Sequence, residues 1–530
     1  MNTVHQQPAR EERVPVLVVG GGLVGLSTAL FLARHGVRSL VLEKHASTAI
    51  HPRARGFNAR TIELLRAAGV GEEVEREGSS FADGQVVGSL TAETLSGPIL
   101  AWQPFGRAAR GLDLSPCPIV ALGQDRLEPI LLRGARAQGV EVRFGHRVLA
   151  FEQGEDCVTA DVEELSTGAR YRARAGYLVG ADGARSPVRE ALGIPRSGRG
   201  SLGHAISTLF HADLSPFRRE HPFFFATITH PDGAGVIVGT DVKDRWLYGT
   251  PYDPARESPA DFTEERWLGR IRAAAGAPDL AVTIAGTFPW EVAERVADRY
   301  GAGRVFLAGD AVHQMPPTGG FGANTGIQDA ANLAWKLAAV VRGQAGAGLL
   351  ATYDAERRPV GVATANQAAL LALKMRLNGP GGAATFDREG ELLDAAVVIF
   401  GHRYGFPDPM PRALELTGAP GTRAPHVWLA QGDRRTSTID LLGDGFALLT
   451  ACPAWAHAAE AVAARTGLPL RERRADGFQA AYGVGPTGAS LVRPDGFVAA
   501  RWPDERGALE RALAEALDAA LHRCDAALHR

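Results

Sequence analysis

The 530-residue chain has few cysteines and almost no net charge, and each scarcity excludes a class of protein. Its four cysteines, Cys117, Cys157, Cys452 and Cys524, lie far apart and form no CxxC pair. A zinc site or a disulfide framework is therefore not expected, and the composition fits a reducing, cytoplasmic compartment. The formal net charge is −2, without a basic block. Nucleic acid is accordingly not an expected partner, and we predict no metal site.

The chain also lacks a long apolar run that is free of glycine. Val14 to Ala33 carries no charged residue, but Gly20, Gly21, Gly22 and Gly25 interrupt it. A membrane-spanning helix of about 20 residues would be predominantly apolar without such a cluster. The acidic pair Glu11 and Glu12 precedes the run, whereas a signal peptide would have a basic leader and a cleavage site. We expect neither a membrane anchor nor a secretion signal.

This stretch instead has the pattern of a dinucleotide-binding turn. Val14–Val19 predicts a buried strand and Leu26–His35 predicts a helix, with Gly20-Gly21-Gly22-Leu23-Val24-Gly25 between them as GxGxxG. The first glycine allows the tight turn, the second lets a pyrophosphate approach, and the third lets helix and strand pack closely. We predict cofactor contacts at Gly20, Gly22, Leu23, Val24 and Gly25.

An acidic residue follows at the expected distance. Val37–Leu42 predicts a second strand, which leads directly into Glu43 and Lys44. Glu43 lies 18 residues after Gly25, where a ribose hydroxyl needs an acceptor. Its charge would repel a 2′-phosphate, so FAD or NAD is favoured over NADP at this turn. Glu43 and Lys44 join the predicted cofactor contacts.

Further motifs follow in a fixed order. They are His51-Pro52-Arg53-Ala54-Arg55-Gly56, then Tyr177-Leu178-Val179-Gly180-Ala181-Asp182-Gly183, then Arg304-Val305-Phe306-Leu307-Ala308-Gly309-Asp310, and then Pro316-Pro317-Thr318-Gly319-Gly320-Phe321-Gly322-Ala323-Asn324. The chain resembles the class A flavin-dependent aromatic hydroxylases of the para-hydroxybenzoate hydroxylase fold over nearly its whole length. Most of all it is similar to members that hydroxylate aromatic polyketides in actinobacterial antibiotic pathways.

The resemblance implies an α/β fold, with a Rossmann-like FAD-binding domain, an inserted antiparallel β-sheet substrate domain and a C-terminal thioredoxin-like domain. The segment Ser201–Thr250 agrees, because it has the alternating pattern of short strands. Lacking CxxC, the last domain is expected to have a structural or interface role. The predicted ranges are 1–80, 105–195 and 285–400 for FAD binding, 81–104 and 196–284 for the substrate, 401–424 for a linker, and 425–530 for the thioredoxin-like domain.

Two aspartates end predicted strands, where α/β folds place ligand contacts. By resemblance, Asp182 lies near the FAD pyrophosphate and is linked to NAD(P)H binding. Asp310, with Gly309, would bind the ribityl chain. The residues alone leave other roles open, because Asp182 also suits a turn and Asp310 also suits a helix N-cap.

The resemblance also implies that Gln124 lies near the FAD and that Arg53, rather than Arg55, lies near the flavin. A capping role for Gln124 is the alternative. For the arginines the alternative is an ordinary solvated surface.

A glycine-rich loop precedes a helix with apolar residues at helical spacing between Ile327 and Val341. Its helix N-terminus would stabilise the negative charge that a reduced flavin carries at its N1–C2=O edge. A surface loop is the alternative. We predict cofactor contacts at Pro317, Gly320, Gly322, Ala323 and Asn324.

The implied activity is that of a monooxygenase with non-covalent FAD. NADPH or NADH would reduce the flavin, O2 would form the C4a-hydroperoxyflavin, and one oxygen atom would enter an aromatic polyketide or other polyphenol. We predict substrate contacts at Phe225, Tyr248 and Pro316, although ordinary strand core is an alternative for the aromatic residues. No catalytic residue can be named from sequence. A homodimer is suggested on family grounds alone.

Other functions remain open on the same motifs. A Baeyer–Villiger oxygenation or an oxidative rearrangement would use the same fold and cofactor, because a fold does not fix a function. A protein that binds FAD without turnover is a further alternative.

Overall fold

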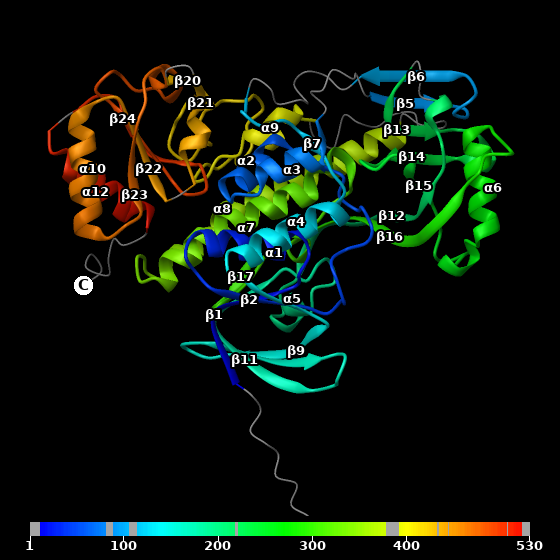
Figure 1. Cartoon of the computed structure of the whole chain (residues 1–530), viewed down its shortest axis with the longest axis horizontal. Coiled ribbons are helices and arrows are strands. Elements are labelled where there is room, and N and C mark those ends of the chain that lie inside the picture. Colours follow the sequence, from blue (N-terminus) through cyan, green and yellow to red (C-terminus); the bar gives the residue numbers. More distant parts are fainter. Residues whose placement is uncertain are drawn as a thin grey trace, which may run out of the picture.

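The computed structural model describes residues 11–80, 88–104, 114–217, 221–377, 392–431, 434–443, 445–505 and 507–521. Parts of the predicted ranges, such as 1–10 and 81–87, and also Cys524, lie outside the described residues. A central α/β unit separates a β-sheet unit at one end from a smaller α/β unit at the other (Figure 1).

The central sheet brings the carboxyl ends of its parallel strands to one level. Its order is β17-β18-β11-β1-β2-β8, and the register pairs Val19 with Gly180 and with Leu42, and Gly180 with Leu307. The segments that follow these strands therefore emerge side by side. The strands are β1 (Glu11–Val19), β2 (Ser39–Glu43), β8 (Glu141–Phe144), β11 (Arg170–Gly180), β17 (Gly301–Ala302) and β18 (Val305–Leu307).

Helices and an antiparallel meander flank this sheet. Helix α1 (Leu23–Arg34) packs against α4 (Gln124–Ala137) and α7 (Phe321–Val341), and α7 packs against α8 (Gly348–Leu377). Strands β9 (His146–Gln153) and β10 (Val158–Glu164) extend from β11 and lie away from these helices in Figure 1. Helix α1 begins three residues earlier than the predicted Leu26, because Gly22 already takes the extended N-cap conformation.

Short elements complete the central unit. Strands β3, β7 and β4 pair in that order, and β7 runs antiparallel to both neighbours. These elements are β3 (Gly56–Phe57), α2 (Ala59–Ala67), α3 (Gly71–Glu77), β4 (Ser79–Ser80), β7 (Val120–Ala121), α5 (Pro187–Ala191) and α9 (Ala395–Phe400).

The second sheet has the order β19-β16-β12-β15-β14-β13-β5-β6, and its neighbours are antiparallel except β13 and β5. The strands predicted for the segment Ser201–Thr250 are present as β12 to β15. The strands are β5 (Gly88–Ala92), β6 (Ile99–Pro104), β12 (Arg196–His211), β13 (Phe223–Ile228), β14 (Gly235–Gly239), β15 (Arg245–Pro251), β16 (Thr283–Ala297) and β19 (His313–Gln314).

The two faces of this sheet differ. Helix α6 (Glu264–Ala275) covers the outer face, where Trp267 and Tyr248 belong to one buried core. A separate apolar patch is built on Leu209, Val238 and Leu247, with partly buried Phe224, Phe225, Val236 and Phe288 packed on it. We call this set the aromatic patch.

The C-terminal unit is a β-sheet of order β23-β22-β24-β25, in which only β22 and β23 are parallel. The chain order βαβαββα is thioredoxin-like. Its elements are β22 (Phe446–Thr450), α10 (Pro453–Thr466), β23 (Leu470–Arg474), α11 (Gln479–Tyr482), β24 (Ala489–Val492), β25 (Val498–Trp502) and α12 (Leu509–Ala520), preceded by β20 (Trp428–Gln431) and β21 (Arg434–Ser437).

A buried ion network joins this unit to the central one. Glu63 on α2 accepts hydrogen bonds from Arg423 and Arg60, the latter at 2.8 Å, and from the Ser115 hydroxyl at 2.6 Å. Burial alone would raise the pKa of Glu63, but the charges of Arg423 and Arg60 outweigh it and lower that pKa. The ionised carboxylate therefore stabilises the folded state at pH values above the ordinary pKa of glutamate. This stabilisation is lost as the pH falls through the lowered pKa of Glu63.

Replacing Arg423 by Met should destabilise the protein by about 3 kcal/mol, because it leaves a buried carboxylate with an incomplete set of partners. Denaturant unfolding followed by tryptophan fluorescence measures the loss. Arg511→Met is the control, since the Arg511–Glu515 pair on α12 is exposed and should contribute nothing measurable. Equal effects of the two substitutions would contradict the prediction.

Candidate active site

The predicted motifs meet at the carboxyl edge of the central sheet. Gly20 follows β1 with φ of 106°, and a Cβ there would lie 2.3 Å from the carbonyl oxygen of Ala181, which follows β11. A Cβ on Gly309, which follows β18, would lie 2.6 Å from Cγ2 of Val24, and so would one on Gly326 of α7. Segments from distant parts of the sequence thus converge on the glycine turn.

Of the three glycines of the GxGxxG motif, only Gly22 leaves room for a ligand. A Cβ on Gly25 would lie 1.8 Å from the Gly20 carbonyl oxygen, whereas a Cβ on Gly22 would meet nothing closer than 3.5 Å. Gly22 is the N-cap of α1, without a side-chain cap or an acid in the first turn. The N–H of Leu23 is hydrogen-bonded to Glu128, and the N–H groups that follow it in the first turn are available to phosphate oxygens.

Glu43 also holds the turn itself. The side chain is buried, and its carboxylate accepts hydrogen bonds from the N–H of Gly21 at 2.6 Å and of His45 at 2.9 Å. A carboxylate has acceptor capacity beyond two bonds, so the predicted ribose contact stays a prediction. Lys44 beside it is exposed. Sequence reasoning missed the turn-holding role, which depends on the position of Glu43 at the end of β2.

Asp310 lines a recess and does not cap a long helix. Its side chain is accessible to solvent, yet burial raises the pKa of its carboxyl, against the charges of His313 and Arg53. A group that is accessible and also surrounded by protein faces a recess, not a convex surface. The charge of Arg53 therefore acts on the residue predicted to bind the ribityl chain, which agrees with placing Arg53 near the cofactor.

Asp182 has a structural partner. Its Oδ2 accepts the backbone N–H of Val188 at 3.0 Å at the start of α5, so the turn-stabilising role is present. Its Oδ1 is buried without a hydrogen-bond partner among the described residues, and burial raises the pKa of the carboxyl. The contact with FAD or NAD(P)H stays a prediction, and the unpartnered oxygen leaves an acceptor for it.

Gln124 does not cap α4, although it is the first residue of that helix. Its amide donates to Glu128 Oε1 at 2.7 Å, and its backbone N–H donates to the Ala54 carbonyl at 2.8 Å. Glu128 is buried and accepts the Ala49 N–H at 2.6 Å. Sequence reasoning missed Glu128, although its i+4 spacing from Gln124 places both on one helix face.

The glycine-rich loop presents accessible backbone at the start of α7. Pro317, Gly319 and Gly320 are exposed, and Gly322 and Ala323 are half-buried. Gly320 is the N-cap, with φ of 65°, no side-chain cap and no acid in the first turn of α7. This N-terminus is therefore available to a partly negative ligand edge.

Asn324 fastens this loop to α2. Its Oδ1 accepts from the Asn58 N–H at 2.9 Å and the Thr61 hydroxyl at 2.7 Å, and its Nδ2 donates to the Gly56 and Gly320 carbonyls. The buried side chain is thus committed to protein partners. Only the backbone of Asn324 remains free to contact a cofactor, and this contact stays a prediction.

A buried acid behind the site was not predicted. Asp329 on α7 accepts the Gly309 N–H at 3.2 Å, His313 Nε2 at 2.7 Å and Arg357 Nε at 2.8 Å. Arg357 donates in turn to the Tyr404 hydroxyl at 3.1 Å. His313 is therefore part of a structural network, and Asp329 fixes the turn that carries Asp310.

The predicted substrate residues separate into two groups. Phe225 is half-buried in the aromatic patch, which supports its prediction. Tyr248 was wrongly predicted: it is fully buried on the α6 face, where its hydroxyl donates to the Gly233 and Ala234 carbonyls. Neighbouring residues of a strand point to opposite faces of the sheet, so Tyr248 lies on the face opposite to that of Leu247 in the aromatic patch. Pro316 is buried and so offers little surface to a substrate, in contrast to the exposed Pro317.

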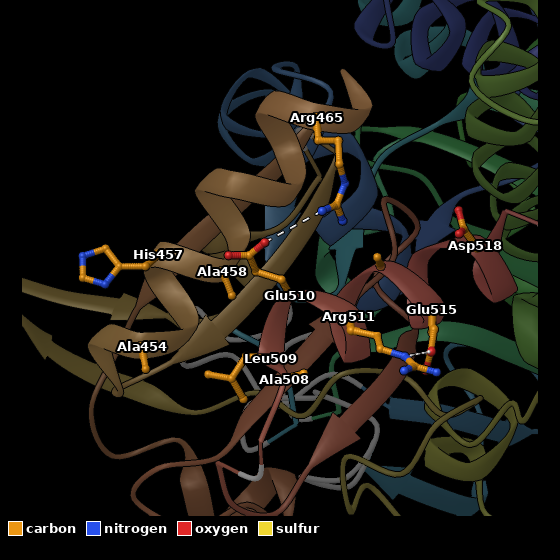
Figure 2. A pocket seen from close by; sticks show the side chains of 11 residues that line it. Ala454, His457, Ala458, Arg465, Ala508, Leu509, Glu510, Arg511, Glu515 and Asp518 are labelled. Carbon is orange, nitrogen blue, oxygen red and sulfur yellow. Dashed lines mark hydrogen bonds and ion pairs between the residues drawn. The ribbon is translucent and has the colours of Figure 1, made fainter.

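A second concave region lies far from these motifs. A recess of about 650 Å³ lies between α10 and α12. Figure 2 shows alanines and the Arg465–Glu510 and Arg511–Glu515 ion pairs among the residues that line it. It contains none of the predicted site residues.

Among the described residues, no helix is long and apolar enough to cross a membrane, and no cluster of three or more His, Cys, Asp or Glu side chains could hold a metal.

Comparisons with known proteins agree with this geometry. Residues 13–368 match the family described as FAD binding domain, and residues 417–523 match the family described as aromatic-ring hydroxylase, C-terminal. The chain is 44% identical to a putative polyketide hydroxylase of Streptomyces halstedii, over 92% of this chain and 93% of the relative. It is 42% identical to the tetracenomycin A2 monooxygenase-dioxygenase of Streptomyces glaucescens, over 95% and 97%.

Solved structures are similar as well. A ternary complex of aklavinone-11 hydroxylase with FAD and aklavinone superposes with a TM-score of 0.88 at 40% identity, covering 97% of this chain and all of that one. The flavin-dependent monooxygenase PieE, in complex with FAD and substrate, gives 0.86 at 34% identity, covering 98% and all of that chain. These likenesses confirm the predicted fold class and the resemblance to polyketide hydroxylases.

Gly22→Ala should weaken FAD binding by about tenfold or more, a loss of about 1.4 kcal/mol, without unfolding the FAD-free protein. The added methyl group would make only an ordinary contact within the protein, with Glu128 Oε1 at 3.5 Å, but it would occupy the approach of the phosphates. Gly25→Ala should destabilise the FAD-free protein itself, because its methyl group overlaps a backbone oxygen. Flavin titration and thermal unfolding measure the two effects.

Gly269→Ala is the matched control for both glycine substitutions, since a Cβ at this exposed position of α6 meets nothing within 4 Å. It should bind FAD normally and gain about 0.5–1 kcal/mol of stability from helix propensity. Normal FAD binding by Gly22→Ala would contradict the placement of the phosphates.

Phe225→Ala should raise the KM for an aromatic substrate by about tenfold, because an aromatic ring is lost from the patch. Tyr248→Phe should leave KM unchanged and cost about 1 kcal/mol of stability, since it removes a buried hydrogen bond on the other face. Steady-state kinetics and denaturant unfolding distinguish the two. A rise in KM with Tyr248→Phe would reinstate Tyr248 as a substrate contact.

Proposed function

Because the chain belongs to the family of FAD-binding aromatic-ring hydroxylases, we propose that it hydroxylates an aromatic polyketide, with NADPH or NADH as reductant and O2 as oxygen source. It is a flavin-dependent aromatic hydroxylase. The observation that carries the proposal is the convergence of Gly22, Asp310 and the α7 N-terminus at the carboxyl edge of one parallel sheet.

The residues at this edge fit FAD. The N-terminus of α1 at Gly22 would bind the pyrophosphate, Asp310 would accept from the ribityl hydroxyls, and the α7 N-terminus would face the flavin edge that becomes negative on reduction. When bound, the flavin supplies electron transfer from the nicotinamide and activation of O2. Asp329 and Asn324 contribute by holding the segments on which these contacts depend.

The aromatic patch supports a polycyclic substrate. Phe224 and Phe225 pack edge to face with centroids 4.8 Å apart, and Phe288 belongs to the same cluster. Aromatic faces bind flat rings well, and an apolar wall excludes water from reactive oxygen chemistry. The relatives named as polyketide hydroxylases and the structure that contains aklavinone favour this substrate class.

The proposal also covers the nicotinamide site, the location, the assembly and the domain boundaries. We propose that NAD(P)H binds transiently at the surface of the FAD-binding unit. The GxGxxG spacing recurs at Gly198–Gly203 and Gly483–Gly488, but the first lies within β12 and the second between α11 and β24. Neither is a strand-to-helix turn of the kind that binds a dinucleotide. The cytoplasmic location rests on the cysteine usage, and the homodimer on the resemblance alone. The domain boundaries given above stay part of the proposal.

The FAD-loaded protein, mixed with NADPH, aklavinone and ¹⁸O2, should consume NADPH and yield a product that has gained one labelled oxygen as a hydroxyl group. Under anaerobic conditions NADPH should bleach the flavin band, faster when aklavinone is bound. Absorption spectroscopy and mass spectrometry with fragment analysis measure these results. Unlabelled O2 is the control for the isotope.

Different failures have different meanings. Labelled oxygen inserted into the carbon skeleton as an ester would indicate a Baeyer–Villiger reaction. A bound flavin that neither NADPH nor NADH bleaches, with the aromatic ligand shown to bind, would contradict the monooxygenase proposal and favour binding without turnover. Rapid bleaching without a product would reject aklavinone as substrate and leave the reaction class standing.

A further inference from the structure

A junction between the two larger units lies beside the aromatic patch. The turn between β14 and β15 docks on the start of α4, where Asp241 accepts the Gly123 N–H at 3.0 Å and pairs with Arg126 at 2.6 Å. Arg245 on β15 pairs with Asp125 on α4 at 2.7 Å. The carboxylates of Asp125 and Asp241 at this junction are therefore already paired with arginines.

Arg55 lies in the neighbouring loop without such a partner. No hydrogen bond or ion pair joins its side chain to any of the described residues, and its Nε is buried. Its backbone carbonyl accepts the Leu122 N–H at 3.2 Å, so the loop is fastened to β7. The side chain is partly accessible by area, but burial lowers the pKa of Arg55 to about 10. The guanidinium is therefore charged at neutral pH and faces a recess.

His51 connects this charge to the aromatic patch. Its ring meets the Phe288 ring edge-on with centroids 3.8 Å apart, and both ring nitrogens are buried without partners in the described part of the chain. Burial, with the charges of Arg53, Arg55 and Arg245, lowers the pKa of His51 to about 4. The imidazole is thus neutral at physiological pH. It is His51 that contacts Phe288 of the patch, and the charge of Arg55 acts on His51.

The other arginines near His51 are committed elsewhere. The charge of Arg53 acts on Asp310 at the cofactor edge, and Arg245 is paired with Asp125 and lies 3.7 Å from Asp241. Arg55 is left as a cation that no described carboxylate neutralises. A buried unpaired charge is costly to the fold, and such a group in a recess is typical of a site that receives a charged ligand.

We propose that Arg55 binds the ionised phenol oxygen of the aromatic substrate and is thereby the residue that selects and activates a phenolate. The inference rests on the proposed function. In the step concerned, the phenol O–H bond breaks, the proton passes to solvent, and the electron pair stays on the oxygen beside the guanidinium. Ionisation makes the aromatic ring richer in electrons and so more reactive toward oxygen transfer. Stabilising the anion would therefore activate the substrate without a catalytic base, and none could be named from the sequence. The charged groups near His51 are Arg55, Arg53, whose charge also acts on Asp310, and Arg245, which is paired with Asp125 and lies 3.7 Å from Asp241.

The test uses the FAD-loaded protein with two probes, 2-hydroxyanthraquinone and 2-methoxyanthraquinone, which differ in whether they can ionise. Arg55→Met should weaken binding of the hydroxy probe by about tenfold and leave the methoxy probe unchanged. Arg55→Lys should restore part of the loss, because it keeps the charge without the planar fork. Arg133→Met, at an exposed pair with Glu73 on the surface of α4, is the matched control and should bind both probes normally.

The visible spectrum of the bound hydroxy probe gives an independent readout. A cation favours the ionised form, so the bound probe should ionise at lower pH than the free probe, and its affinity should rise with pH up to the pKa of the free probe. Arg55→Met should move the ionisation of the bound probe back to or above that of the free one.

Three outcomes would overturn the inference. Equal weakening of both probes would make Arg55 a packing residue, unchanged binding of the hydroxy probe would remove it from the site, and loss of FAD from Arg55→Met would assign it to the cofactor. Each of these leaves the proposed function intact. Failure of both probes to bind the wild-type protein, by contrast, would count against the proposed substrate class and against this inference with it.

Discussion

The close approach of backbones at a few glycines is the constraint on which the rest of the structure depends. The carbonyl of Gly20 lies where a Cβ on Gly25 would be, and Gly20 itself lies against Ala181. Val24 fills the space beside Gly309 and Gly326. Because a glycine stands at each of these close approaches, the ends of β1, β11 and β18 and the start of α7 form one continuous edge.

Buried acids then fix that edge from behind. Asp329 ties the Gly309 turn to α8 through Arg357, whose hydrogen bond to Tyr404 continues to the stacked ring of Phe497, 4.0 Å away in the C-terminal unit. Glu63 and Glu356 make parallel links to Arg423 and Arg493. The C-terminal unit is thus bonded to the elements that carry the site, and a supporting role for it stays a prediction.

The substrate side is organised by the two faces of one sheet. The α6 face is closed by packing and by satisfied hydrogen bonds such as that of Tyr248. The other face keeps half-buried aromatic rings beside a junction at which most charges are paired and Arg55 is not. An apolar wall with one uncompensated cation at its rim suits a flat ring system that carries an ionisable oxygen.

The sequence by itself determined the glycine turn, the strand ends and the family, since these depend on local spacing: Gly20 to Gly25, Glu43, Asp182 and Asp310 lie at the expected edge. Only the tertiary structure decided which face each strand residue occupies, and so it corrected Tyr248 and separated Pro316 from Pro317. It alone also revealed Glu128, Asp329 and Arg55. Their roles arise from burial and from partners distant in the chain, and no local pattern records whether a buried charge finds a counterion.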